Sequence, residues 1–388
     1  MPVTLTEEQQ DLATAIGEFA RREVPDKARR DELTVEGPHS MEIYRKMAEQ
    51  GWLGIALPEA YGGSGGSMTD LLVFLEETSY HQIPIGGFGT TIITAAAIER
   101  NGSEAQKREL LGGAVDGRLL AISMSEPGAG SDVGALTCRA EKTENGWVVN
   151  GQKTWCSNAH ISSHILLVAR TSGGASGATG EGGAGGKHDG LTMFVVPTDA
   201  QGLEIHGIET MGGKEVNDLY FTDCRLPADA VVGTEGQGWR QLMAGLNLER
   251  MILAGLMLGL ARRAFDDTLA YVTQRRQFGR PVGSFQALRH RIADNATELA
   301  ATKLLVHDTA RTVDADPGAL FPREASMAKL KATELAKHLS LEGMQMLGGY
   351  GYATEYGMER LLRQSVVSTV YGGTSEIQRD IIGKTYGL

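Results

Sequence analysis

Glu249 is an ionisable residue that interrupts an otherwise apolar stretch of the sequence. It lies in the segment Leu246-Asn-Leu-Glu249-Arg250, which runs directly into an apolar stretch that begins at Met251. A carboxylate among such neighbours is costly to bury unless it is paired or functional. The alternative is a surface glutamate paired with a nearby arginine, and the apolar flanks disfavour it. We therefore expect Glu249 to be a functional carboxylate.

Five further segments combine glycine, hydroxyl, cationic and aromatic residues in runs that core packing does not explain. Glycine permits a phosphate or a flat ring to approach bare backbone N–H groups. The cations of Arg275–Gly279 would also suit the C-terminal dipole of a preceding helix. The segments are Met124–Asp132, Gly151–Asn158, Arg275–Gly279, Gln345–Gly351 and Tyr371–Arg379.

Three other motifs resemble functional signatures but lack the context that those signatures need. His160 and His164 have the spacing of helical metal ligands, yet they fall in a strand-and-turn pattern, so we expect no metal site. Gly128–Gly134 resembles a dinucleotide fingerprint outside any βαβ pattern. Glu76 and Glu77 are adjacent on a predicted helix and therefore point to different faces. We interpret the two glutamates as solvated charge.

The composition limits the class of protein. The chain has 388 residues, 41% of them hydrophobic, and a net charge of −11. It can bury a large core and is a poor binder of nucleic acid or anionic membranes. Three cysteines are too few, and odd in number, for a disulfide framework. No signal pattern opens the chain, and its longest purely apolar run, Met251–Ala261, is half a membrane span. We expect a soluble, cytoplasmic protein.

Hydrophobic periodicity divides the chain into an N-terminal helical domain (1–118), a middle β domain (119–233) and a C-terminal helical bundle (234–388). The bundle is expected to begin with one long, buried helix over 238–274. Inside the β domain, Ser172–Gly186 is almost entirely Gly, Ala, Ser and Thr, which predicts an exposed, mobile loop. The β domain also contains two Asn-Gly pairs, the strongest short-range hairpin signal. These pairs are Asn145-Gly146 and Asn150-Gly151.

Capping signals locate several helix ends. Capping boxes at Thr6–Gln9 and Ser103–Gln106 predict two helix starts, and Gly112-Gly113 is expected to stop the second helix. Ser40 and Thr69 are expected to be N-caps of two further helices.

With the five segments in this order, the chain resembles the acyl-CoA dehydrogenase family over essentially its whole length. The resemblance implies an α+β fold with an N-terminal helical domain, a middle antiparallel β-barrel-like domain and a C-terminal four-helix bundle. It implies FAD as cofactor, a homotetramer, and dehydrogenation of an acyl-CoA thioester to the trans-2-enoyl-CoA. An electron-transferring flavoprotein would then accept the electrons.

The resemblance also implies where the catalytic base lies. Many family members carry a glutamate in a Tyr-Glu-Gly-Thr segment, which here reads Tyr371-Gly372-Gly373-Thr374. The chain is similar to the isovaleryl-CoA and long-chain branches, which place a glutamate on the long helix, and Glu249 matches that position. Glu249 is therefore expected to remove the α-proton while the flavin accepts hydride from Cβ. A Gly372→Glu exchange is expected to restore part of the activity lost with Glu249.

Contacts with cofactor and substrate follow from the same resemblance. Ile122 stands where relatives often have an aromatic residue, Ser157 where many have threonine, and Asn247 where many have aspartate. Some of the bundle's contacts would reach the flavin of a neighbouring subunit. The expected FAD contacts are Ile122, Met124, Ser125, Ser131, Trp155, Cys156, Ser157, Arg275, Phe278, Gln286, Gln345, Gly348, Gly349, Thr374, Ser375 and Glu376. The expected substrate contacts are Ser131, Arg240, Asn247, Arg250, Tyr371, Gly372 and Gly373.

Three alternatives stay open within this resemblance. The acyl group could be attached to a carrier protein, or O₂ could be the electron acceptor of an acyl-CoA oxidase. The missing glutamate at position 372 also allows a non-catalytic flavin-containing binding protein, which Glu249 and the net charge of −11 disfavour. Short branched, terpenoid and long straight acyl chains are all compatible with a glutamate on the long helix.

Overall fold

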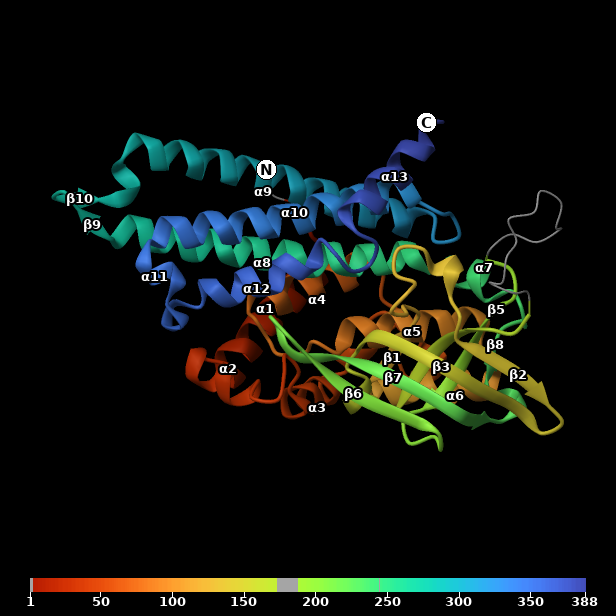
Figure 1. Cartoon of the computed structure of the whole chain (residues 1–388). Coiled ribbons are helices and arrows are strands. Elements are labelled where there is room, and N and C mark those ends of the chain that lie inside the picture. Colours follow the sequence, from red (N-terminus) through yellow and green to blue (C-terminus); the bar gives the residue numbers. More distant parts are fainter. Residues whose placement is uncertain (1–2, 173–187, 244) are drawn as a thin grey trace. The chain divides into compact units, whose positions relative to one another are not determined.

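The computed structural model describes residues 3–172, 188–243 and 245–388, which form two compact units (Figure 1). Unit 1 comprises Met1–Leu33, Gly66–Pro84 and Asn247–Leu388, and unit 2 comprises Thr34–Gly65 and Ile85–Leu246. The expected division into three sequence domains stays a prediction, because both units take residues from 1–118. Beyond Ser172, the expected mobile loop lies outside the described residues.

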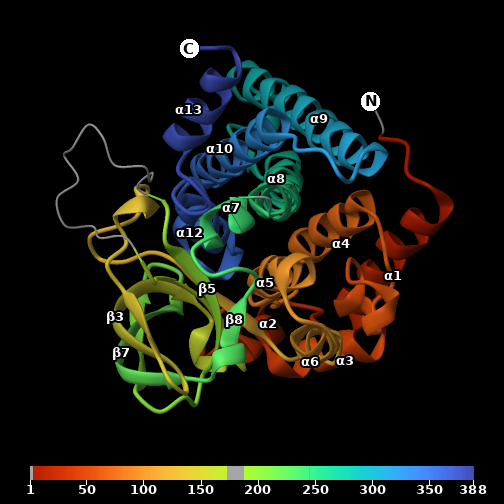
Figure 2. The same cartoon turned by 90° about the vertical axis from the view of Figure 1, so that its right-hand side faces the viewer.

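Unit 1 is helical. Its long helices α8, α9 and α10 run side by side, and the short β9–β10 hairpin joins α8 to α9 (Figures 1 and 2). Its elements are α1 (Glu7–Glu23), α2 (Lys27–Leu33), α4 (Met68–Tyr80), α8 (Leu246–Gln274), β9 (Arg276–Gln277), β10 (Arg280–Pro281), α9 (Gln286–Ala315), α10 (Pro322–Leu347), α11 (Gly349–Tyr352), α12 (Met358–Ser368) and α13 (Ser375–Thr385).

Unit 2 combines short helices with a strongly curved eight-stranded sheet (Figure 2). The strand order is β6-β7-β3-β2-β4-β5-β8, with β1 beside β4. Only the β1–β4 and β2–β4 pairs are parallel among the described strands of this sheet. The elements are α3 (Met41–Glu49), α5 (Phe88–Asn101), α6 (Glu104–Val115), β1 (Leu120–Ser123), β2 (Arg139–Thr143), β3 (Gly146–Ser157), β4 (His164–Arg170), β5 (Leu191–Pro197), β6 (Leu203–Thr210), β7 (Gly213–Leu226), β8 (Val231–Val232) and α7 (Gly238–Met243).

Three of the four predicted helix starts are confirmed and one is wrong. Thr6 and Ser103 form complete capping boxes, and Ser40 caps α3. Thr69 is not a cap, because Ser67 forms a capping box with Asp70 and α4 begins two residues earlier than expected, at Met68.

Glycine interrupts the chain at some predicted positions and not at others. Gly112-Gly113 does not stop α6, which continues to Val115 because its buried face packs through this turn. Asn145-Gly146 does lie at the hairpin between β2 and β3, where Glu144 and Asn145 form the turn and Gly146 begins β3. Asn150-Gly151 instead lies at a β-bulge within β3, where Gly151 has φ +140° and a Cβ would lie 2.8 Å from the Cα of Cys138.

The helix expected over 238–274 is described as two helices, α7 and α8, with Gly245 in a turn between them. Among the described residues, the segment Gly238–Gln274 is the one long and apolar enough to cross a membrane. The most apolar part of this segment is 59% buried inside the protein. Packing in a protein core therefore explains why the segment is so apolar.

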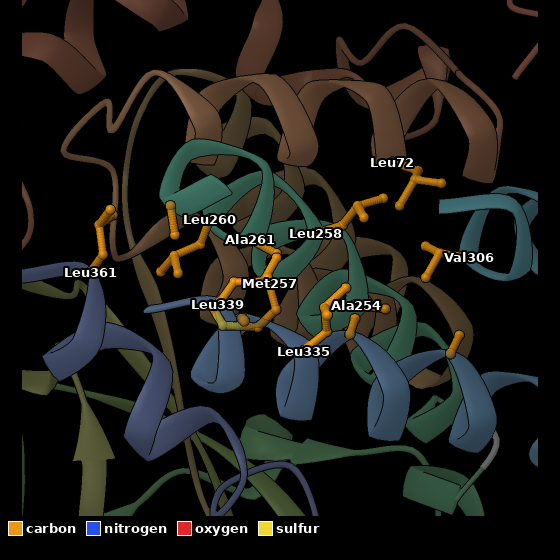
Figure 3. Close-up of a cluster of buried hydrophobic side chains, with 14 of the residues drawn as sticks. Leu72, Ala254, Met257, Leu258, Leu260, Ala261, Val306, Leu335, Leu339 and Leu361 are labelled. Atoms are coloured by element: carbon orange, nitrogen blue, oxygen red, sulfur yellow. The ribbon is translucent and has the colours of Figure 1, made fainter. Parts of the chain in front are cut away.

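The core of unit 1 lies between α4, α8, α9, α10 and α12 (Figure 3). Leucine and methionine side chains such as Leu258 and Met257 fill it, and many facing positions on α8 and α10 are alanine, which allows the helices to approach closely. The backbones of α8 and α4 approach very closely at Gly259, because a Cβ there would lie 2.1 Å from the carbonyl oxygen of Glu76. This packing fixes α8 against α4.

Glu76 is a buried ionic centre, so the interpretation of Glu76 and Glu77 as solvated charge was wrong for Glu76. Only 2% of Glu76 is exposed, and its carboxylate accepts hydrogen bonds from Arg262 (2.5 Å), Lys303 (2.9 Å) and His307 (2.8 Å). Burial alone would raise its pKa, but the His307 hydrogen bond and the neighbouring cations outweigh burial and lower the pKa to about 2. Glu77 also binds Arg262. One carboxylate thus joins α4, α8 and α9.

We predict that Glu76→Gln lowers the free energy of unfolding by about 3–5 kcal/mol, because Arg262 and Lys303 lose a buried anionic partner. The folded-state pKa of Glu76 is below the unfolded value of about 4.3, so this stabilisation is present above that value and is lost as the pH falls towards 2. Urea unfolding of both proteins at neutral and acidic pH checks it. The exposed Glu298→Gln should cost less than about 1 kcal/mol, and equal effects of the two exchanges would contradict the prediction.

Candidate active site

Glu249 lies in the first turn of α8, at the edge of the apolar core of unit 1. Its side chain is half-buried. Arg250 does not bind it, because the Arg250 guanidinium donates a hydrogen bond to Asn247 Oδ1 at 2.8 Å. No hydrogen bond to the Glu249 carboxylate is present within residues 3–172, 188–243 and 245–388. Burial raises the pKa of Glu249, while the charges of Arg250 and Lys329 partly oppose the rise.

The backbone of Gly372 lies against Glu249. A Cβ at position 372 would be 3.5 Å from Glu249 Oε1 and only 2.3 Å from Leu253 Cδ1. Gly372 has φ +62° and Gly373 has φ +78°, and side chains are disfavoured at such angles. A carboxylate on α8 and a side chain at position 372 would therefore compete for the same space. The structure argues against the expectation that Gly372→Glu restores activity, because that exchange strains the backbone and collides with Leu253.

Other expected contacts gather at the far end of the bundle. Arg275 lies over the ring of Tyr350 at 5.5 Å, which brings the C-terminal end of α8 close to α11. Phe278 has φ +50° and is 94% exposed. Gln286 begins α9, and Gln345, Gly348 and Gly349 lie at the junction of α10 and α11. Gln274 is about 38 Å from Glu249 at the helical rise of 1.5 Å per residue. The expected cofactor and substrate contacts of unit 1 thus fall into two groups, one around Glu249 and one around Arg275 and Phe278.

In unit 2, a buried ion pair holds the segment that contains Met124 and Ser125. Lys153 is fully buried, and its ammonium group donates to Glu126 Oε1 and to the carbonyl of Met124, both at 2.8 Å. Glu126 also accepts hydrogen bonds from Thr137 and from the backbone N–H of Cys138. Neither residue of the pair was singled out from the sequence. The sequence indicated the pair only in that Glu126 lies within Met124–Asp132 and Lys153 within Gly151–Asn158.

Trp155 is the most unusual residue of β3. It lies within a register shift of the strand, with φ +61°, and is 59% exposed. A bulky residue held in the left-handed region marks strain that persists when its surroundings demand it, often at a binding site. Cys156, by contrast, points into the core, and its Sγ lies 3.4 Å from the carbonyl oxygen of Ile122. Only its backbone is available for contact.

The remaining expected residues divide between exposed and buried positions. Ser131 and Arg240 are exposed in unit 2, and Tyr371 and Glu376 are exposed in unit 1. Thr374 caps α13, whereas Ser375 is buried and its hydroxyl lacks a hydrogen-bond partner in the described part of the chain. Ile122, Met124, Ser125 and Ser157 are partly exposed.

Each unit by itself has an exposed aromatic ring and open glycine backbone of the kind that suits a flat ring and a phosphate chain. Trp155 and Phe278 present exposed aromatic rings, and Cβ atoms at Gly128, Gly130, Gly348 or Gly349 would meet nothing within 4 Å. Open backbone of this kind can approach a ligand closely. Among the described residues, no group of three or more His, Cys, Asp or Glu is placed to hold a metal ion.

Comparisons with known proteins identify the family whose sequence pattern this chain carries. Models of the acyl-CoA dehydrogenase N-terminal, middle and C-terminal domains match residues 6–118, 121–224 and 236–387. Mitochondrial isovaleryl-CoA dehydrogenase of Arabidopsis thaliana is 34% identical over 384 residues, covering 97% of this chain and 90% of that protein. The Bacillus subtilis (strain 168) protein named "Probable acyl-CoA dehydrogenase YngJ" is 34% identical over 396 residues and covers 99% of both. A solved acyl-CoA dehydrogenase from Geobacillus kaustophilus has a TM-score of 0.91, with 31% identity and complete coverage of both chains.

We predict that Lys153→Met lowers the free energy of unfolding by about 3–5 kcal/mol, because Glu126 is left charged and buried. Adding Glu126→Gln to that variant should recover part of the loss. The exposed Lys142→Met, which breaks the Lys142–Glu235 pair on the same sheet, should cost less than about 1 kcal/mol. Urea unfolding of the four proteins provides the comparison. A single Lys153 variant as stable as the double variant would refute the role given to the pair.

Proposed function

This chain belongs to the acyl-CoA dehydrogenase family of FAD-dependent oxidoreductases, and we propose that Glu249 is the base of its α,β-dehydrogenation. The observation that carries the proposal is the position of Glu249 Oε1, 3.5 Å from where a Cβ of residue 372 would lie. Relatives that carry the base at position 372 would place its carboxylate from the loop. This chain would bring the carboxylate of Glu249 to the same place from α8.

The electrostatics of Glu249 suit a base. A general base works best when its pKa lies near the operating pH, and burial shifts the pKa of Glu249 upwards. Its carboxylate has no hydrogen-bond donor among the described residues, so its lone pairs are free to accept a proton from Cα. Glu249 would hold that proton while FAD, when bound, accepts hydride from Cβ.

The glycine loop contributes a second group. The N–H of Gly372 makes no hydrogen bond within the described residues, and a Cβ on this residue would lie 3.5 Å from Glu249 Oε1. We assign it to the thioester carbonyl, where a donor stabilises the negative charge that develops as the α-proton leaves. Arg250 and Asn247, which bind each other, would shape the substrate pocket on the same turn of α8.

The substrate proposed is a short branched acyl-CoA. The similarity to an isovaleryl-CoA dehydrogenase over 97% of this chain supports it, as does a 32% identity to the short/branched chain specific enzyme of Bos taurus. The expected substrate contacts Ser131 and Arg240 are both exposed.

The assembly proposed is a homotetramer. Glu249 and the group around Arg275 and Phe278 are about 38 Å apart along one helix, a span that a single flavin dinucleotide does not bridge. The second group would therefore complete the FAD site of a neighbouring subunit. Phe278, 94% exposed on one chain, would be covered there.

The electron acceptor proposed is an electron-transferring flavoprotein, and the compartment is the cytoplasm. All three cysteines are buried and free, as a reducing compartment permits. A solved protein titled as an electron transferring flavoprotein of Acidaminococcus fermentans has a TM-score of 0.89 and 29% identity to this chain.

We predict that Glu249→Gln retains FAD but loses dehydrogenation by at least about 10³-fold, because an amide cannot accept the α-proton. Glu249→Asp should retain a small part of the activity, since it keeps a carboxylate that lies farther from the substrate. Glu8→Gln, on the exposed face of α1, serves as the matched control. The measurement is turnover with an artificial electron acceptor, and near-normal activity of Glu249→Gln would remove Glu249 from this role.

We also predict that an anaerobic titration with acyl-CoA thioesters bleaches the flavin band most completely with short branched chains. Medium and long straight acyl-CoAs serve as comparisons. Bleaching by long chains alone would contradict the substrate proposal and leave the reaction intact. If no acyl-CoA bleaches the flavin, the acyl group comes from a carrier protein or the protein is a non-catalytic flavin-binding relative. Rapid reoxidation by O₂ would favour an oxidase over transfer to a flavoprotein.

A further inference from the structure

Lys329 is a fully buried lysine on α10 that the dehydrogenation described above leaves without a role. None of its surface is exposed. Its ammonium group donates hydrogen bonds to two backbone carbonyls, those of Ser368 at 3.0 Å and Gly373 at 2.9 Å. Ser368 is the last residue of α12, and Gly373 belongs to the loop that lies against Glu249. Lys329 thus connects a helix end to this loop.

Making these two hydrogen bonds with a charged group carries a desolvation penalty. A buried ammonium group costs several kcal/mol of desolvation unless an anion compensates it. No carboxylate is hydrogen-bonded to Lys329 in the described residues. The strongest attraction it has is to Glu249, followed by Glu334 on α10 and Glu376 on α13, while Arg250 on α8 repels it. A neutral donor would cap the carbonyls without this cost.

Gln378 is a neutral donor to the same loop. Its Nε2 donates to the carbonyls of Gly372 (2.9 Å) and Gly373 (3.1 Å) from a fully buried position on α13. The loop therefore has two buried supports that differ in charge. This difference separates an electrostatic role of Lys329 from a purely structural one.

We propose that Lys329 is a positioning residue for the dehydrogenation. Its ammonium group holds the Gly372–Gly373 backbone against Glu249 and, together with Arg250 on α8, supplies positive charge that favours the ionised Glu249 carboxylate, the form able to accept a proton. This inference rests on the proposed role of Glu249 as base. It is supported by the titration behaviour of both groups. Burial lowers the pKa of Lys329 to about 8, so it stays charged at neutral pH, and its charge opposes the rise that burial causes in the pKa of Glu249.

The test is an infrared titration of the FAD-loaded protein, in which the carboxyl band that disappears in Glu249→Gln reports protonation of Glu249. Lys329→Met should raise the midpoint of that band by about one pH unit or more, because a nearby positive charge no longer favours the carboxylate. Lys329→Arg keeps the charge and should leave the midpoint near that of the unchanged protein. Gln378→Leu loosens the loop without changing charge, so it should lower stability and leave the midpoint in place.

The pH dependence of flavin bleaching in a single turnover gives the second readout, and its acidic limb should move with the infrared midpoint. An unmoved midpoint in folded Lys329→Met, or an equal shift in Gln378→Leu, would overturn the proposal. If Lys329→Met does not fold, Lys329→Gln replaces it, since the amide removes the charge and keeps a donor. A shifted midpoint together with an active Glu249→Gln would instead leave the electrostatic role standing and refute Glu249 as the base.

Discussion

A carboxylate without a hydrogen-bonded partner, held in the first turn of a largely buried helix, is the constraint on which this protein depends. Glu249 can remain there because α8 is fixed against α4 through close contacts at Gly259 and because residue 372 has no side chain to occupy the space beside it. The glycine loop itself needs support, which Lys329 and Gln378 supply from two other helices. Helix packing, loop geometry and the base are therefore parts of one arrangement.

Two buried glutamates and the half-buried Glu249 illustrate how surroundings decide what a carboxylate does. Glu76 accepts hydrogen bonds from Arg262, Lys303 and His307, and its pKa is lowered to about 2. Glu126 is held by Lys153 and by Thr137 and Cys138, and its pKa is also lowered. Both are locked in the charged state, which suits a structural role. Glu249 has nearby charge without hydrogen bonds, and its pKa is raised, which suits proton transfer.

Much of this could be predicted from sequence where the signal is local. Capping boxes, strand alternation and the apolar flanks of Glu249 depend on neighbouring residues, and the family and fold were both identified correctly. The errors arose where the partner is distant. Glu76 resembled solvated charge because Arg262, Lys303 and His307 lie 186 to 231 residues away. Lys329 was missed for the same reason, since one lysine on a helix gives no sign of the loop carbonyl that it binds 44 residues later.

The most direct measurement of the central claim isolates proton removal from hydride transfer. An acyl-CoA analogue that binds but cannot lose hydride from Cβ is incubated with the FAD-loaded protein in deuterated water, and deuterium at Cα is followed by mass spectrometry. We expect steady incorporation with the unchanged protein and none above background with Glu249→Gln, although both bind the analogue. Incorporation at the same rate in the two proteins would show that another group removes the α-proton.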